Sequence, residues 1–83
     1  MTSLELQVLF FGRYAELFGT ESLPLRLLPG ATVADAVKAL REQPAGNLLP
    51  RQLLCAVNLR QVAPDHPLAT GDELALLPPL AGG

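Results

Sequence analysis

Apolar and polar residues alternate in the first part of the chain, which predicts two strands. In residues 4–11, one face is wholly apolar and the other begins polar and ends apolar. A period of two is typical of a strand. Residues 21–28 alternate again, and Pro24 among them favours a position at the edge of a sheet. Between these segments, residues 14–18 fit a helical turn that Gly19 ends.

The next segment carries the signals of a helix. Thr32 is a good N-cap, and Asp35 stands where the acid of a capping box belongs. The apolar residues that follow recur at helical spacing and form a single stripe: Val33, Ala36, Val37 and Leu40. Pro44 ends the helix. Residues 43–51 are expected to form a loop with at most a short turn.

Two further strands complete the pattern. Residues 53–57 are short and apolar, as in a buried strand, and residues 73–77 form the last strand. The order is therefore two strands, a helix and two strands. An α+β fold with a mixed sheet and one main helix on one face accounts for it. If the first and last strands pair in parallel at the centre, this is the ubiquitin-like β-grasp.

The alternation also predicts which side chains the helix leaves uncovered. One set is expected to face the helix stripe: Leu6, Val8, Phe10, Leu74 and Leu76. Leu9, Phe11 and Leu77 then point to the open face of the sheet. Three large apolar side chains close together on an exposed face usually mark an interface.

Residues 1–77 are interpreted as one domain and residues 78–83 as an extended apolar tail. The tail begins with Pro78 and Pro79, continues through Leu80, and ends in Gly82 and Gly83. The prolines remove backbone donors, so the tail should leave the last strand unpaired. Glycine has no Cβ, so the end of the tail can enter a channel too narrow for other residues.

Composition excludes several classes of protein. The chain has 83 residues and a net charge of −2, and its six basic residues are scattered, whereas a nucleic-acid site needs clustered cations. With Cys55 as its one cysteine, it has no internal disulfide framework and no thiol set for structural zinc. No secretory signal and no long apolar run are present, which predicts a cytoplasmic protein without membrane contact.

Other residues with chemical potential have structural interpretations. Cys55 lies in an apolar strand without a neighbouring cation and is assigned to the core. His66 lies in a turn, where a hydrogen-bonding role is expected. Asp72 and Glu73 are adjacent on a strand, so they point to opposite faces, and Gly71-Asp72 is turn chemistry. No phosphate-binding glycine loop is present, so we expect no cofactor bound by this chain.

Several segments together resemble the small, sulfur-carrying subunit of molybdopterin synthase, a member of the ubiquitin-like sulfur carriers. The resemblance spans nearly the whole chain. It rests on Val8-Leu9-Phe10-Phe11-Gly12 with residues 13–19, on Ala56-Val57-Asn58, on Asp65-His66-Pro67-Leu68, and on Gly71-Asp72-Glu73 followed by Pro78-Pro79 and the final Gly82-Gly83. The family often has aromatic residues where Leu76 and Leu77 stand, so partner preference can differ.

The resemblance implies a carrier that is not catalytic alone. In such proteins the carboxylate corresponding to Gly83 is adenylated by an activating enzyme, which uses ATP, and is then converted to a thiocarboxylate. The sulfur passes to cyclic pyranopterin monophosphate inside a large catalytic subunit, giving molybdopterin for the molybdenum cofactor. The carrier and the large subunit form a heterotetramer. The residues expected at this interface are Leu9, Phe11, Leu77, Pro78, Pro79 and Leu80, with Gly82 and Gly83 entering the active site.

Three alternatives remain open at this point. The chain could carry sulfur for another pathway, such as thiamine synthesis, tRNA thiolation or tungsten cofactor synthesis. It could be a ubiquitin-like modifier whose Gly83 forms isopeptides with lysines. It could also be a passive β-grasp binding module. Which protein binds the chain, and whether its terminus accepts sulfur, distinguishes them.

Overall fold

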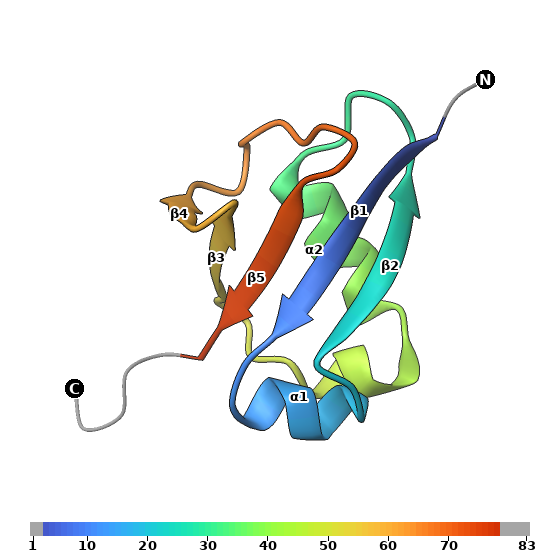
Figure 1. Ribbon diagram of the computed structural model, residues 1–83. Helices are drawn as coiled ribbons and strands as arrows, with labels where there is room; N and C mark the ends of the chain where they lie inside the picture. Colours follow the sequence, from blue (N-terminus) through green and yellow to red (C-terminus); the bar gives the residue numbers. More distant parts are fainter. Residues whose placement is uncertain (1–2, 79–83) are drawn as a thin grey trace.

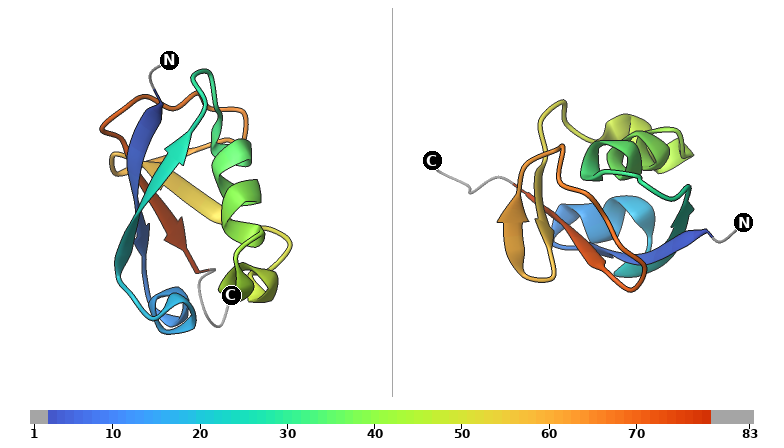
Figure 2. Two further views of the ribbon diagram at one scale, coloured as in Figure 1. Left: turned by 90° about the vertical axis from the view of Figure 1, so that its right-hand side faces the viewer. Right: turned by 90° about the horizontal axis from the view of Figure 1, so that it is seen from above.

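A five-stranded mixed sheet and one main helix form the two layers of the molecule (Figure 1). The computed structural model describes residues 3–78. The elements in chain order are β1 (Leu4–Phe10), α1 (Arg13–Phe18), β2 (Ser22–Leu27), α2 (Val33–Arg41), the 3₁₀ helix η1 (Pro44–Leu48), β3 (Leu54–Val57), β4 (Arg60–Val62) and β5 (Glu73–Leu77). Helix α2 covers one face of the sheet and leaves the other open (Figure 2).

The strand order is β2-β1-β5-β3-β4, with the first and last strands of the chain side by side at the centre. β1 and β5 run parallel, and Phe10 pairs with Leu76. β2 is antiparallel to β1, and β3 is antiparallel to β5. The expected β-grasp is therefore confirmed. Pro24 lies in edge strand β2, as the sequence predicts.

The short strand β4 is a feature that the sequence analysis missed. Its three residues are too few to show a period, and a turn at Asn58 and Leu59, both with positive φ, connects it to β3. The Asn58 side chain holds this turn against the start of β5. Its amide donates to Asp72 Oδ1 at 2.9 Å, and its Oδ1 accepts from the Glu73 N–H at 3.0 Å.

Helix α2 begins with the predicted capping box. The Asp35 N–H donates to Thr32 Oγ1 at 3.4 Å, and the Thr32 N–H donates to Asp35 Oδ2 at 2.9 Å. Two N–H groups that the helix itself leaves without partners are thereby satisfied. The stripe of α2 packs on the sheet, with Val33, Ala36 and Leu40 buried.

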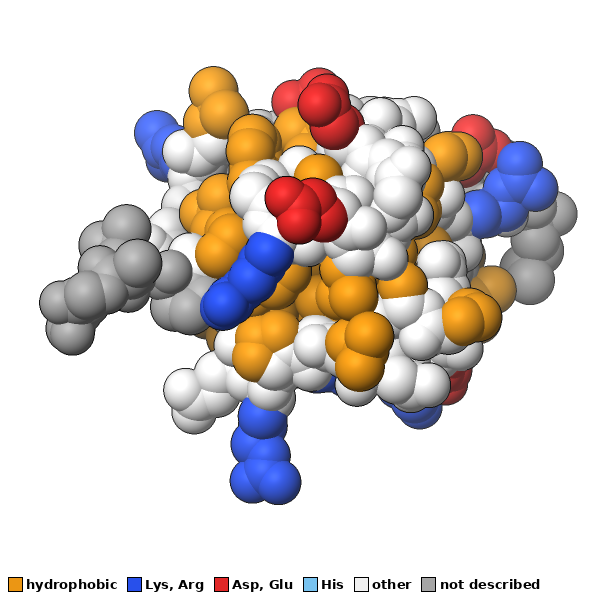
Figure 3. Space-filling model, turned by 90° about the horizontal axis from the view of Figure 1, so that it is seen from below, with side chains coloured by type: hydrophobic (Ala, Val, Ile, Leu, Met, Phe, Trp, Pro, Cys, Tyr) orange, Lys and Arg blue, Asp and Glu red, His pale blue; other side chains and the backbone are white. Residues whose placement is uncertain are grey.

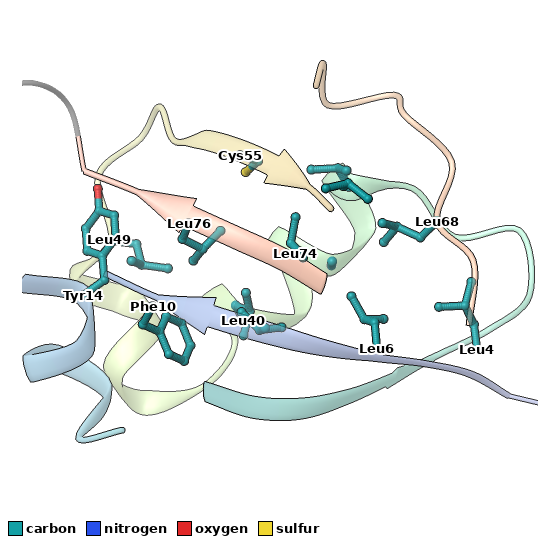
Figure 4. Close-up of a cluster of buried hydrophobic side chains, with 14 residues drawn as sticks. Leu4, Leu6, Phe10, Tyr14, Leu40, Leu49, Cys55, Leu68, Leu74 and Leu76 are labelled. Carbon is teal, nitrogen blue, oxygen red and sulfur yellow. The ribbon is translucent and has the colours of Figure 1, made fainter. Parts of the chain in front are cut away.

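The core lies between α2 and the covered face of the sheet (Figure 4). All five strand residues predicted to face the helix are buried: Leu6, Val8, Phe10, Leu74 and Leu76. Cys55 and Val57 of β3 are buried with them. The prediction that the whole third strand is buried was wrong at Leu54. This side chain is 41% exposed, because alternation turns it to the open face.

The segment after α2 contains the 3₁₀ helix η1, where the sequence predicted a loop. Gly46 of η1 lies directly against the end of α2: a Cβ at this position would overlap the Leu40 carbonyl and stand 2.7 Å from the Arg41 Cα. Arg41 fixes the chain beyond η1. Its guanidinium donates to the carbonyls of Leu49, Pro50 and Arg51, at 3.3, 2.8 and 2.8 Å.

Replacing Gly46 with alanine should destabilise the domain. The new methyl group has no space against the α2 backbone, so η1 must move away. Such overpacking costs about 1–3 kcal/mol of unfolding free energy, measurable by urea denaturation. Asn47→Ala, at the neighbouring exposed position of η1, is the control and should change stability by less than about 0.5 kcal/mol. Equal losses for the two variants would contradict the close approach of η1 to α2.

Tyr14 of α1 is a buried residue with an unsatisfied polar atom. It is 2% exposed and lies beside Leu49 (Figure 4). Among residues 3–78, its hydroxyl has no hydrogen-bond partner. A buried hydroxyl without a partner costs about 1–3 kcal/mol.

The Tyr14→Phe variant should therefore be at least as stable as the parent chain. The substitution removes the hydroxyl and keeps the shape of the ring, so part of the desolvation cost is recovered. Thermal and urea unfolding measure the difference. A loss of more than about 1 kcal/mol, the typical net value of one hydrogen bond, would mean that the hydroxyl does have a partner.

Candidate partner-binding face and tail exit

The open face of the sheet carries an apolar patch at the end where β5 finishes. Leu54 pairs with Leu77 across β3 and β5, and these two residues alternate with core positions. Leu9 pairs with Ala75 one row further along. We call Leu9, Phe11, Leu54 and Leu77 the open-face patch.

The parallel pairing of β1 and β5 brings Phe11 to the same place. Phe10 pairs with Leu76, so extending the register by one residue sets Phe11 beside Leu77. Phe11 is 47% exposed, and Leu9 and Leu77 are half-buried. The three residues that the sequence assigned to the open face therefore do come together. Leu54 joins them, which the sequence analysis missed because the register of β3 is a long-range property.

The patch occupies only one half of the open face. The next rows toward the other end of the sheet carry polar side chains, where Gln7 pairs with Glu73 and both are exposed. A hollow of about 670 Å³ borders Leu9 and Phe11 and has Glu16 and Glu21 in its wall. An apolar area with a polar border is typical of a protein interface.

The chain leaves the sheet at this same end, beside Gly12. A second step of the β1–β5 register sets Gly12 next to Pro78, and a Cβ on Gly12 would stand 3.4 Å from Pro78 Cγ. Gly12 has φ +55°, a region that favours glycine. Glycine at this position therefore allows the turn into α1 and also leaves space for Pro78 to pass close by. Sequence reasoning gave Gly12 only the role of ending the strand.

The apolar surface continues around the tail exit. Figure 3 looks at the end of the molecule that carries α1 and shows hydrophobic side chains spread over it, with separate charged side chains between them. Leu48 of η1 is 73% exposed, and Leu17 and Phe18 of α1 are half-buried.

The remaining predicted site residues belong to the tail. Pro78 is half-buried. Pro79, Leu80, Gly82 and Gly83 lie outside the described residues, so their assignment to the interface and to the chemistry stays a prediction.

The structure supports the structural interpretations of the other candidates. Asp72 Oδ2 accepts from the Ala69 N–H at 2.8 Å, a hydrogen bond that stabilises the turn before β5. His66 acts through its backbone, since its carbonyl accepts from the Val33 N–H at 3.0 Å. No group of three or more potential metal ligands occurs in residues 3–78. Within the same range, no helix has the length and apolar character needed to cross a membrane.

Cys55 is buried as predicted, but one premise about it was wrong. Burial raises the pKa of its thiol above the ordinary value, whereas Arg41 acts in the opposite direction. A cation is thus close to the thiol, although the sequence around Cys55 holds none, because folding brings α2 next to β3. Since burial is the larger effect, the thiol stays protonated and is not an activated nucleophile.

Known proteins that are similar in sequence or in fold align with nearly the full chain. The molybdopterin synthase sulfur carrier subunit of Escherichia coli (strain K12) is 39% identical, with 94% of this chain and 99% of that protein aligned. SAMP1 from Haloferax volcanii is 31% identical, with a TM-score of 0.82 over 95% of this chain and 99% of that one.

A protein–protein complex of subunits 1 and 2 of molybdopterin-converting factor from Helicobacter pylori contains a chain of the same fold. That chain is 23% identical, with a TM-score of 0.71 over 96% of this chain and 100% of its own length. The model of the ThiS family matches residues 8–83. With the β-grasp topology and the E. coli relative aligned over nearly the full length of both chains, this match shows that the chain belongs to the ThiS family.

Proposed function

We propose that this chain is the sulfur carrier subunit of a molybdopterin synthase. The observation that carries the proposal is the 39% identity, over nearly the full length of both chains, to a protein of that name. The Gly82-Gly83 ending and the apolar patch beside the tail exit agree with it.

The proposed chemistry takes place on the carboxylate of Gly83. A carboxylate is a poor electrophile, so an activating enzyme first joins it to AMP at the expense of ATP. A persulfide then displaces AMP, and a second thiol cleaves the acyl disulfide to leave a thiocarboxylate. This sulfur attacks the cyclic pyranopterin monophosphate in the large subunit, so nucleophilic catalysis is shared between two proteins. The carrier supplies the sulfur and the large subunit supplies the active site.

The open-face patch is the proposed contact with the large subunit. In the Helicobacter pylori structure the chain of this fold is in complex with a second subunit. The patch and Pro78 lie at the same end of the sheet. A partner seated on Leu77 and Phe11 would therefore receive the tail without any change in the domain.

A ubiquitin-like modifier is the second candidate. SAMP1 from Haloferax volcanii, the small archaeal modifier protein 1, is 31% identical to this chain. Both functions require adenylation of the terminal glycine, so adenylation alone does not separate them. The step after adenylation separates them. The terminal glycine of a carrier takes up sulfur, whereas that of a modifier forms an amide bond with the amino group of a lysine.

Incubation with ATP, the activating enzyme and a persulfide donor should convert Gly83 to a thiocarboxylate. Intact mass should rise by one exchange of oxygen for sulfur, and fragmentation should place the change on Gly83. Cys55→Ser is the control, since its buried thiol has no role and the variant should gain the same sulfur. Gly82→Trp should block the reaction, because the tail would no longer fit a narrow channel. Transfer to lysines without any thiocarboxylate would instead establish the modifier.

Replacing Leu77 with glutamate should weaken binding to the large subunit by about 2 kcal/mol or more, as for a central residue of an interface. Isothermal titration calorimetry measures this effect. The melting temperature should change little, because Leu77 is half-buried on the open face. Leu28→Glu is the matched control at an exposed leucine that follows β2, outside the patch, and should bind normally. Equal weakening by both variants would place the interface elsewhere.

A further inference from the structure

A second apolar surface lies on the helix-covered side of the molecule and meets the open-face patch at Leu54. A groove of about 1030 Å³ runs between α2, the chain before β3, and the β3–β4 hairpin. Its apolar wall comes from Val33, Val37, Leu53 and Val62, with Cys55 at its floor. The groove arises because β4 is short and α2 lies over the centre of the sheet, so the edge of the core beside β4 is not covered.

The charges around this groove are all of one sign. Lys38, Arg41 and Arg51 line it, and no acidic residue does, among the described residues. These are three of the six basic residues in a chain of net charge −2. The groove is therefore a local basic site on an acidic protein.

Within residues 3–78, the three cations have no carboxylate partner. The ion pair found in residues 3–78 joins Arg26 to Glu5, on the other side of the sheet. Lys38 and Arg51 are exposed. Arg41 donates to three backbone carbonyls, and two of the five N–H donors of its guanidinium make no hydrogen bond within residues 3–78. A fixed guanidinium with free donors binds a carboxylate with little loss of entropy.

We propose that this groove is a docking site for an acidic, extended peptide segment of a partner protein. Apolar side chains of the segment pack on Val37 and Val62 above Cys55, and its carboxylates pair with Lys38, Arg41 and Arg51. The alternation of an apolar wall with three cations fits an extended segment whose apolar and acidic side chains alternate. This proposal does not depend on the sulfur-carrier function.

The groove and the open-face patch share Leu54. The rest of the groove uses the face of the sheet that packs on α2, whereas Leu9, Phe11 and Leu77 lie on the opposite face. An occupant of the groove thus leaves Leu9, Phe11, Leu77 and Pro78 accessible and reaches the patch at Leu54.

The test uses the full chain labelled with nitrogen-15 and a capped heptapeptide of alternating acidic and apolar residues, ELDVELD. Titration should give saturable shifts of the backbone amides of Val37, Lys38, Cys55 and Val62 and leave Leu9 and Leu77 unchanged. Two control peptides divide the interaction into its parts. KLKVKLK reverses the charge and EGDSEGD removes the apolar side chains, and both should bind at least about tenfold more weakly.

Charge reversal on the protein gives the second arm. The double variant Lys38→Glu/Arg51→Glu should bind ELDVELD at least about tenfold more weakly, because like charges then face each other. Arg26→Glu/Arg60→Glu changes the net charge equally at exposed sites outside the groove and should bind as the parent does. Lys38→Gln/Arg51→Gln is a milder form of the first variant, should the reversal disturb folding, and thermal unfolding verifies each protein.

Three results would overturn the proposal: shifts confined to the open face, equal binding of ELDVELD and KLKVKLK, or equal loss in the two charge-reversed proteins. Binding of EGDSEGD as tight as that of ELDVELD would also overturn it. In that case only charge is recognised, and the groove itself plays no part.

Discussion

The parallel pairing of β1 with β5 is the interaction on which the other features depend. It joins the two ends of the domain at the centre of the sheet, and its register decides what lies on each face. Phe10 beside Leu76 completes the core, while Phe11 beside Leu77 forms the open-face patch. Continued to Gly12 and Pro78, the same register fixes where the tail leaves. A shift of one residue would exchange the side chains of the core with those of the open face.

The buried side chains of the core are separate from those of the open-face patch. Within residues 3–78, the core comes from β1, β5, α2 and their neighbours. The proposed entry of the tail into a partner would therefore leave these core contacts in place. Arg41 and Gly46 stabilise the segment between α2 and β3. Gly46 allows η1 to pack against α2, and Arg41 binds the chain that leads into β3.

The two sides of the sheet offer different chemistry to partners. The open-face patch is apolar and lies next to the tail exit, which suits the proposed large subunit. The groove beside α2 is apolar with a basic border, which suits an acidic segment. The two surfaces meet at Leu54 and otherwise lie on opposite faces, so an occupant of the groove leaves the rest of the patch accessible.

The sequence alone determined the features that depend on neighbours in the chain. The capping box of Thr32 and Asp35, the period-two alternation of residues 4–11 and the edge position of Pro24 are local signals, and each was confirmed. The three predicted residues of the open face followed from the same alternation. Family resemblance supplied the expected role of the tail, which stays a prediction.

Only the tertiary structure decided the features that depend on register and on contacts between distant segments. Leu54 becomes part of the patch because β3 pairs with β5, and a cation reaches Cys55 because α2 crosses the sheet beside β3. Strand β4 is too short to show an alternation of apolar and polar residues, and only its pairing with β3 defines it as a strand. Gly46 must be glycine because η1 packs against the α2 backbone. These contacts are long-range, and a pattern read along the chain carries no information about them.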